Sequence, residues 1–146
     1  MLQEHNSSAC SGPQPRLLLI EDHAELAEVT ALILREAGID VRVAMSGKDA
    51  LQEAAAWCPE MVLCDLTLPD IPGLEVVQTL RELPQTKNSL IAIHSMMSEW
   101  EIRSLEQNIR AGTINLVLSK PITEEKVERL LTNFAALRER RAASRT

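Results

Sequence analysis

The sequence lacks features that define several classes of protein. It has no run of 18 apolar residues, which argues against a hydrophobic transmembrane helix. Its N-terminus lacks the basic and apolar regions of a secretory signal peptide. Basic residues are outnumbered, and the formal net charge of −6 argues against nonspecific nucleic-acid binding by the domain as a whole. We therefore expect no membrane partner and no direct binding of nucleic acid.

Cysteine is also scarce. Cys10, Cys58 and Cys64 form no CxxC pair and have no histidine at metal-ligand spacing, so the sequence indicates no zinc site. Cys64 lies inside an apolar run and is expected to be a small buried side chain. An odd number of apparently unpaired thiols fits a reducing compartment, so we expect a cytoplasmic protein.

The composition is that of a soluble globular chain. Its 146 residues, 45% hydrophobic and 25% charged, are enough for one domain with a sizeable core. Residues 1–15 are polar and contain two prolines, which indicates a flexible arm. Residues 138–146 form a basic tail or the start of a linker, either solvated or suited to an acidic partner. The domain itself is expected over residues 16–137.

Short apolar stretches alternate with segments of helical periodicity, which predicts βαβ units and a parallel sheet. The expected strands are residues 16–20, 39–43, 61–64, 90–94 and 116–119. Helix signals include Ser46 and Ser98 as N-caps and Gly38 as a C-terminal stop. The apolar positions expected to form the buried helix faces are Leu26, Val29, Ile33, Leu34, Ala50, Leu51, Ala54, Leu74, Val77, Leu80, Ile102, Leu105, Ile109, Val127, Leu130, Leu131 and Phe134.

Four of the five expected strands end on residues suited to phosphate or metal chemistry. These residues are Glu21 with Asp22, then Asp65, Ser95 and Lys120. In an open parallel sheet, ligands bind outside the carboxyl ends of the strands, so we expect these side chains to share one cleft. Three carboxylates suit Mg²⁺, and an aspartate such as Asp65 can become an aspartyl-phosphate. Lys120 and Ser95 would then supply a positive charge and a hydroxyl to the phosphoryl group.

With these motifs in this order, the chain resembles the receiver domain of response regulators in two-component signalling. The resemblance covers about residues 16–137. It rests on Leu18-Leu19-Ile20-Glu21-Asp22, on residues 44–51, on Asp65 through Pro69 to Gly73, on Ala111-Gly112 and on Lys120-Pro121, for which a cis peptide bond is expected.

The resemblance implies an α/β, flavodoxin-like (βα)5 doubly wound parallel sheet with strand order 2-1-3-4-5. It also implies roles for the site residues. Asp65 is the expected phospho-acceptor, Ser95 the switch hydroxyl and Lys120 the invariant lysine of the family. The expected Mg²⁺ ligands are Glu21, Asp22, Asp65 and the backbone carbonyl of Thr67.

The same resemblance implies a signalling role and not a metabolic enzyme. The expected partner is a sensor histidine kinase or a histidine phosphotransfer protein, which passes a phosphoryl group to Asp65. The domain itself would catalyse only its Mg²⁺-dependent self-phosphorylation and autodephosphorylation. A homodimer is also implied, through the face formed by the helix expected over residues 98–112, the strand at residues 116–119 and the last helix, which begins near residue 123.

Three features depart from the family pattern. Met96 follows Ser95 where the family has alanine or glycine, and its longer side chain is expected to hinder access to the phosphoryl site. The chain has no tyrosine and its only phenylalanine is Phe134, so Leu116 or Val117 takes the place of the family's switch aromatic. His94 precedes Ser95 and is expected to be a packed or hydrogen-bonded strand residue.

Several alternatives stay open at this level. The main one is a phosphorylation-independent pseudo-receiver that acts as a protein-binding module. A haloacid-dehalogenase-type phosphotransferase fits poorly, because Asp65-Leu66-Thr67 lacks the second aspartate of that motif. Trp100 is either a partner contact or a half-buried anchor. The chain is either a stand-alone receiver or the N-terminal part of a longer protein.

Overall fold

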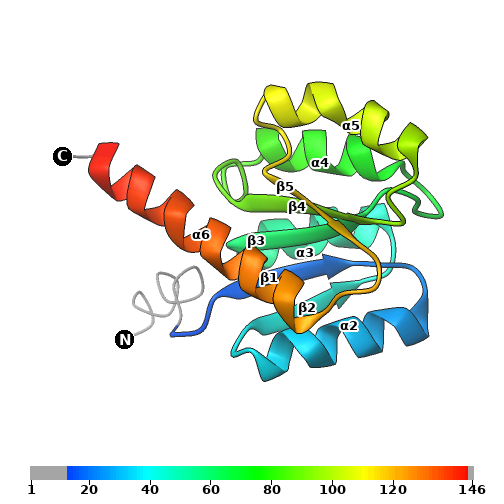
Figure 1. The fold of residues 1–146 in the computed structure, drawn as a ribbon, viewed down its shortest axis with the longest axis horizontal. Helices are drawn as coiled ribbons and strands as arrows, with labels where there is room; N and C mark the ends of the chain where they lie inside the picture. Colours follow the sequence, from blue (N-terminus) through cyan, green and yellow to red (C-terminus); the bar gives the residue numbers. More distant parts are fainter. Residues whose placement is uncertain (1–12, 145–146) are drawn as a thin grey trace.

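The structure is a computed structural model, and it describes residues 13–144. Within this range the chain forms a single parallel sheet of five strands in the order β2-β1-β3-β4-β5 (Figure 1). The strands are β1 Arg16–Ile20, β2 Asp40–Ala44, β3 Met61–Asp65, β4 Leu90–Ser95 and β5 Leu116–Ser119. The expected fold class and strand order are therefore confirmed.

Helices connect the strands and cover both faces of the sheet (Figure 1). They are α2 Ala24–Glu36, α3 Gly47–Trp57, α4 Gly73–Glu82, α5 Glu99–Arg110 and α6 Glu124–Ser144. Apolar side chains of α2 and α6 pack on one face of the sheet, and those of α3, α4 and α5 pack on the other. The helices alternate with parallel strands because each crossover must return the chain to the same end of the sheet.

Alternation along the strands divides the core into two layers. In β1, Leu17 and Leu19 face α2 and α6, whereas Leu18 and Ile20 face α3, α4 and α5. All four side chains are buried, as expected for a strand in the middle of a doubly covered sheet. β2 lies at the sheet edge and exposes Arg42, which explains its alternating polarity.

The helix ends follow the local signals in the sequence. The Ser46 hydroxyl accepts a hydrogen bond from the Asp49 N–H, and Ser98 forms a complete capping box with Glu101. Gly38 follows α2 with φ +88°, a backbone conformation in which a Cβ is unfavourable.

Some details of the expected elements are wrong. β2 lies one residue later than expected. Val29 is 55% exposed, because α2 packs on the sheet through the smaller Ala27 and Ala31 with Thr30 and Leu34. On α5, Ile102 and Ile109 are also exposed, and only Leu105 is buried.

Near the ends of the chain, α6 continues to Ser144, so the basic residues from 138 onward extend a helix. The limit expected at residue 137 stays a prediction. Most of the flexible arm expected over residues 1–15 lies outside the described residues.

The cysteines differ in part from expectation. Cys64 is free and buried in β3, as expected. Cys58 is disulfide-bonded, which corrects the expectation that its thiol is unpaired. Cys10 lies outside the described residues. A search of residues 13–144 finds no helix with the length and apolar character needed to cross a membrane.

Candidate functional site

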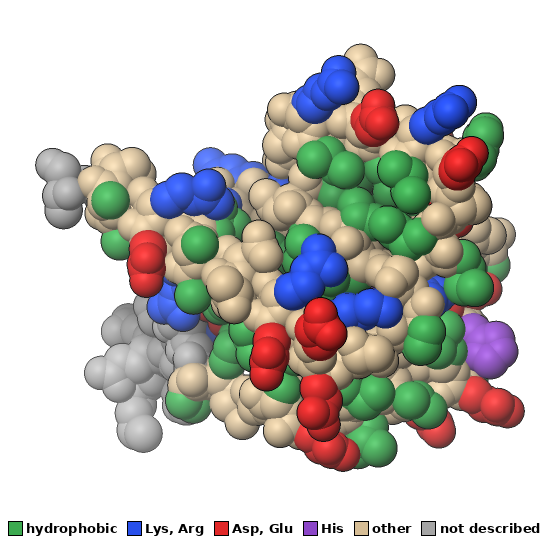
Figure 2. Space-filling model, in the orientation of Figure 1, with side chains coloured by type: hydrophobic (Ala, Val, Ile, Leu, Met, Phe, Trp, Pro, Cys, Tyr) green, Lys and Arg blue, Asp and Glu red, His purple; other side chains and the backbone are tan. Residues whose placement is uncertain are grey.

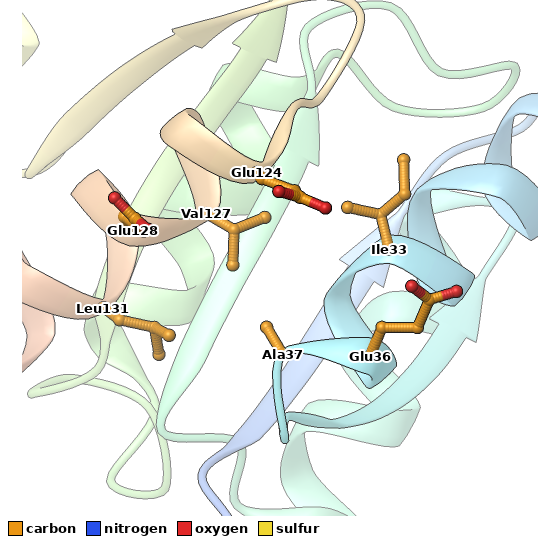
Figure 3. A pocket seen from close by; sticks show the side chains of 7 residues that line it. All are labelled: Ile33, Glu36, Ala37, Glu124, Val127, Glu128 and Leu131. Atoms are coloured by element: carbon orange, nitrogen blue, oxygen red, sulfur yellow. The ribbon is translucent and has the colours of Figure 1, made fainter.

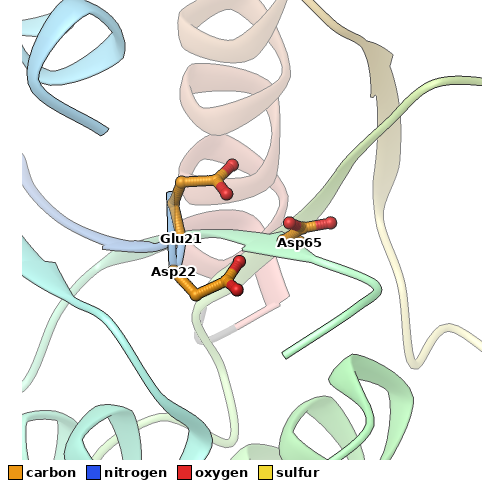
Figure 4. Close-up of side chains that lie close together, drawn as sticks. All are labelled: Glu21, Asp22 and Asp65. Carbon is orange, nitrogen blue, oxygen red and sulfur yellow. The ribbon is translucent and has the colours of Figure 1, made fainter. Parts of the chain in front are cut away.

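The carboxyl ends of β1 and β3 bring three carboxylates together. These strands are neighbours, with Ile20 in register with Cys64, so Glu21 and Asp22 lie beside Asp65 (Figure 4). One carboxylate oxygen from each of the three residues lies within 4.8 Å of the others. Glu21 is buried, Asp65 is half-buried and Asp22 is exposed, so the cluster opens to solvent on one side.

Lys120 forms ion pairs with two of the three acidic residues, Glu21 and Asp65. It follows β5, and its Nζ lies 3.1 Å from Oδ2 of Asp65 and 3.0 Å from Oε1 of Glu21. The peptide bond from Lys120 to Pro121 is cis, as expected. The ammonium thus bridges two carboxylates that come from different strands.

Burial and ion pairing together set the charges at the site. Burial raises the pKa of Glu21, and the negative charge of Asp65 acts in the same direction, while the hydrogen bond from Lys120 opposes it. Burial alone would lower the pKa of Lys120, but the hydrogen bonds and charges of Glu21 and Asp65 outweigh it and raise that pKa. Lys120 is therefore charged at neutral pH and offsets part of the carboxylate charge.

Ser95 ends β4 in a buried position next to this group. Its Oγ accepts a hydrogen bond of 3.2 Å from the N–H of Met97, and its carbonyl accepts one of 2.7 Å from the N–H of Lys120. Met97 has φ +63°, a left-handed conformation that is uncommon for a residue with a side chain. Met96 is 73% exposed, so its side chain is not packed into the site.

Thr67 lies in the loop that joins β3 to α4, residues 66–72, which also borders the site. Its N–H donates a 3.3 Å hydrogen bond to Oδ1 of Asp65. The N–H of Gly73 donates to the carbonyl of Leu66 at 2.9 Å and closes the loop where α4 begins. Two hydrogen bonds thus hold the loop in place, one from Thr67 to the carboxylate of Asp65 and one from Gly73 to the carbonyl of Leu66.

Asp70 anchors the same loop to the start of α3, a role that the sequence did not reveal. Its carboxylate accepts hydrogen bonds from the N–H groups of Gly47 at 2.8 Å and Lys48 at 2.9 Å, and also from that of Ile71. The bonds to Lys48 and Gly47 hold the pKa of Asp70 below its usual value. The only local signal was an aspartate between two prolines, which is equally typical of an ordinary turn.

His94 is packed beneath the site and does not reach a hydrogen-bond partner. The residue is 1% exposed, and neither ring nitrogen has a partner among residues 13–144. Burial, together with the nearby charge of Lys120, lowers the pKa of His94 to about 4. The imidazole is therefore neutral at physiological pH, and the packed role expected of it is the one observed.

Leu116 and Val117, the two candidates for the position of the family's switch aromatic, both lie in β5. Val117 packs partly buried against the core on the side of α3, α4 and α5, whereas Leu116 packs against the opposite core. Trp100, in the first turn of α5, is 77% exposed, so it is not a half-buried anchor. His23 is exposed, and its Nδ1 accepts a hydrogen bond from the N–H of Leu26 at the start of α2.

The donor set fits a hard divalent cation. Carboxylate oxygens in a site open to water are the ligands that Mg²⁺ prefers, since it keeps several waters and accepts phosphate oxygens. The cluster contains neither cysteine nor histidine, which a soft or borderline transition metal would favour.

Solved structures with the same architecture include bacterial response regulators. A putative response regulator from Chloroflexus aurantiacus J-10-fl is 32% identical, with a TM-score of 0.74 over 84% of this chain and 98% of the other. A CheY-like receiver domain from Methylobacillus flagellatus is 30% identical, with a TM-score of 0.74 over 83% of this chain and 98% of the other.

Curated relatives include a transcriptional activator and a DNA-binding response regulator. The transcriptional activator protein ExaE of Pseudomonas putida is 32% identical over 125 residues, which are 82% of this chain and 56% of that protein. The DNA-binding response regulator MtrA of Mycolicibacterium paratuberculosis is 39% identical over 66 residues, which are 45% of this chain and 29% of MtrA. The chain thus spans only part of the length of these relatives.

The family model of the response regulator receiver domain matches residues 17–132, which include the acidic cluster, Ser95 and Lys120. This match extends over the five strands, apart from Arg16, and over the first part of α6, up to residue 132. The chain therefore belongs to the response regulator receiver domains of two-component signalling.

Proposed function

We propose that this receiver accepts a phosphoryl group on Asp65 and passes the signal to a partner or an output domain. The observation that carries this proposal is the position of Lys120, whose Nζ lies between Asp65 and Glu21 at 3.1 and 3.0 Å. A carboxylate beside a fixed ammonium and further acidic groups is suited to receive a phosphoryl group and to stabilise its charge.

In the proposed transfer, an oxygen of Asp65 attacks the phosphorus of a phosphohistidine. A new P–O bond forms as the P–N bond breaks, and the electron pair of that bond returns to the imidazole of the donor. Lys120 stays protonated and faces the oxygens of the transferred group. Its raised pKa supports this role, because the ammonium then persists through the physiological pH range.

The transfer requires that the repulsion between carboxylates and phosphate be reduced. Glu21, Asp22 and Asp65, with the backbone carbonyl of Thr67, would hold Mg²⁺, which supplies positive charge to the phosphoryl oxygens. The half-buried Asp65 and the exposed Asp22 leave this side of the cluster open to the incoming group.

Phosphorylation is proposed to act on the rest of the domain through Ser95. The added charge and acceptor oxygens would attract its hydroxyl, which now accepts a hydrogen bond from Met97. Movement of Ser95 would change the loop that leads into α5 and thus the surface formed by α5, β5 and α6. We propose this surface as the site for a partner or for a homodimer.

The donor is proposed to be a sensor histidine kinase or a histidine phosphotransfer protein that shares the cytoplasm with the receiver. The relatives named as DNA-binding and transcriptional regulators are longer than the match, so an output domain on the same polypeptide is also proposed. The receiver itself is not proposed to contact nucleic acid.

Labelling with a small phosphodonor tests the proposal directly. The wild-type protein incubated with the donor and Mg²⁺ should gain the mass of one phosphoryl group, measured on the intact chain. Addition of EDTA should prevent the gain. Labelling of equal extent in the presence of EDTA would contradict the proposed metal-assisted transfer.

Metal binding can be tested separately with Asp22→Asn. The change replaces one proposed carboxylate ligand by a neutral amide, so the affinity for Mg²⁺ measured by calorimetry should fall at least about tenfold, or 1.4 kcal/mol. Without metal, the free energy of unfolding should stay level or rise, because one like charge leaves the cluster. A marked loss of stability without metal would instead give Asp22 a structural role.

The pseudo-receiver alternative is favoured by one observation, Met96 next to Ser95 in the place of a small residue. Because this side chain is 73% exposed, we expect it to hinder access only in part. Met96→Ala should raise the rates of phosphorylation and autodephosphorylation by up to about tenfold, equivalent to 1.4 kcal/mol. Mass spectra recorded over time would measure both rates. Failure of both proteins to become phosphorylated would favour the binding-module alternative.

A further inference from the structure

A groove with an apolar floor and an acidic rim lies between α2 and α6, away from the acidic cluster (Figure 3). Its volume is about 380 Å³. Ile33 and Ala37 of α2 and Val127 and Leu131 of α6 form the apolar lining. Glu36, Glu124 and Glu128 stand at its edges, and Figure 2 shows acidic side chains gathered where the start of α6 meets α2.

The apolar surface continues beyond the groove on α2. Val29 is 55% exposed and Leu32 is 56% exposed. Val29 lies one helical turn before Ile33, so these side chains adjoin the groove lining. Two large apolar side chains exposed next to a groove indicate an interaction surface.

The sequence of α6 shows which occupant fits. This helix has 21 residues and is about 30 Å long, and its second half extends past the edge of the sheet (Figure 1). Spacings of four and three residues align one stripe along its exposed side, consisting of Glu124, Glu128, Leu131, Ala135, Arg138 and Ala142. The stripe is acidic at its first end, apolar in the middle and basic or small at its second end.

Such a stripe is complementary to itself in the antiparallel direction. In a symmetric pair centred on Asn133, Glu128 of one copy faces Arg138 of the other, and Leu131 faces Ala135. Among residues 13–144, neither Glu128 nor Arg138 forms an ion pair, so both charges are available for one. The Arg138 guanidinium lies 5.4 Å from the centroid of the Phe134 ring on its own helix, and Arg138 also lines a pocket with residues of the loops that precede β3 and β4.

We propose that the groove between α2 and α6 is a homodimer interface occupied by the second half of α6 from another copy. The two copies are related by a twofold axis, so each α6 places its basic end against the acidic groove of the other. Ala135 and Ala142 allow the two helices to approach closely, and Val29 and Leu32 extend the apolar contact. This surface differs from the face formed by α5, β5 and α6, and it needs no phosphorylation.

The test measures the mass of the unphosphorylated protein in solution by light scattering after size exclusion. The wild type should have about twice the chain mass of 16.2 kDa. Glu128→Arg places two arginines opposite each other, and Arg138→Glu places two glutamates opposite each other, so each variant alone should be a monomer. Both positions are exposed, and circular dichroism would confirm that the variants fold.

Charge restoration gives the decisive result. The double variant with Glu128→Arg and Arg138→Glu re-forms both ion pairs with reversed polarity and should be dimeric again. An equimolar mixture of the two single variants should also form a dimer, because every facing pair is then opposite in charge. Arg140→Glu, on the other side of α6, and Trp100→Ala, on α5, are matched controls that should remain dimeric.

Several results would overturn the inference. A wild type that is monomeric at every soluble concentration would exclude a second copy as the occupant. A dimer that both single charge reversals leave intact, or that only Trp100→Ala dissociates, would assign the contact to another surface. Single variants that dissociate but form no dimer when mixed would show that Glu128 and Arg138 do not face each other.

Discussion

Asp65→Asn is expected to abolish phosphorylation by a small phosphodonor, the largest effect on activity that any single change in this chain should have. The amide is not nucleophilic, so no P–O bond forms, while the side chain keeps almost the same size. Because Glu21 still accepts a hydrogen bond from Lys120 at 3.0 Å, the site should keep its arrangement and the protein should fold. Intact mass and circular dichroism would measure the two properties.

A matched control for this change is Asp40→Asn on the edge strand β2, far along the sheet from the site. It also removes one carboxylate, but its labelling should equal that of the wild type. Phosphorylation of Asp65→Asn at the wild-type level would show that another residue is the acceptor. The ion pairs of Lys120 with Asp65 and Glu21 would then serve to stabilise the fold and not to assist phosphorylation.

Gly73→Ala is expected to have the largest effect on stability. A Cβ at this position would overlap the carbonyl oxygen of Asp65 and lie 2.8 Å from the Cα of Leu66. Both neighbours are backbone atoms, which cannot move aside as the end of a flexible side chain can. We expect the free energy of unfolding to fall by about 3 kcal/mol, at the upper end of overpacking effects.

Urea unfolding would measure this loss, with Gly38→Ala as the control. Gly38 has φ +88° but no atom within 4 Å of an added Cβ, so only the backbone conformation opposes the change. That strain costs about 1 kcal/mol. Equal losses in the two variants would contradict the steric argument for Gly73. In Gly73→Ala, displacement of the Asp65 carbonyl should also slow labelling, whereas Gly38→Ala should label normally.

Much of the fold was predictable because local patterns and tertiary packing agree. Five apolar stretches alternate with amphipathic ones, and that alternation is enough to predict a parallel sheet with crossover helices. The caps at Ser46 and Ser98 depend on the serine side chain and on groups three residues further along the chain, so they are visible in the sequence alone. The strand order came from the resemblance to the receiver family.

The candidate site was predictable only in part. Polar residues after successive strands indicated that Glu21, Asp22, Asp65, Ser95 and Lys120 would share one edge of the sheet, and the structure brings them there. Their functional roles stay predictions. The link from Asp70 to α3 joins residues more than 20 positions apart through backbone N–H groups, which carry no sequence signal.

The amino-acid sequence by itself determined which segments become strands, where most helices end and which chemistry gathers at the sheet edge. These properties depend on neighbouring residues and on the period of the hydrophobic pattern. Only the tertiary structure decided that Lys120 bridges Asp65 and Glu21, because a residue 55 positions away in the chain must first be placed beside the carboxylate. It also decided that α2 buries Ala27 and Ala31 and leaves Val29 exposed, since the side of a helix that meets the sheet depends on how closely the two pack.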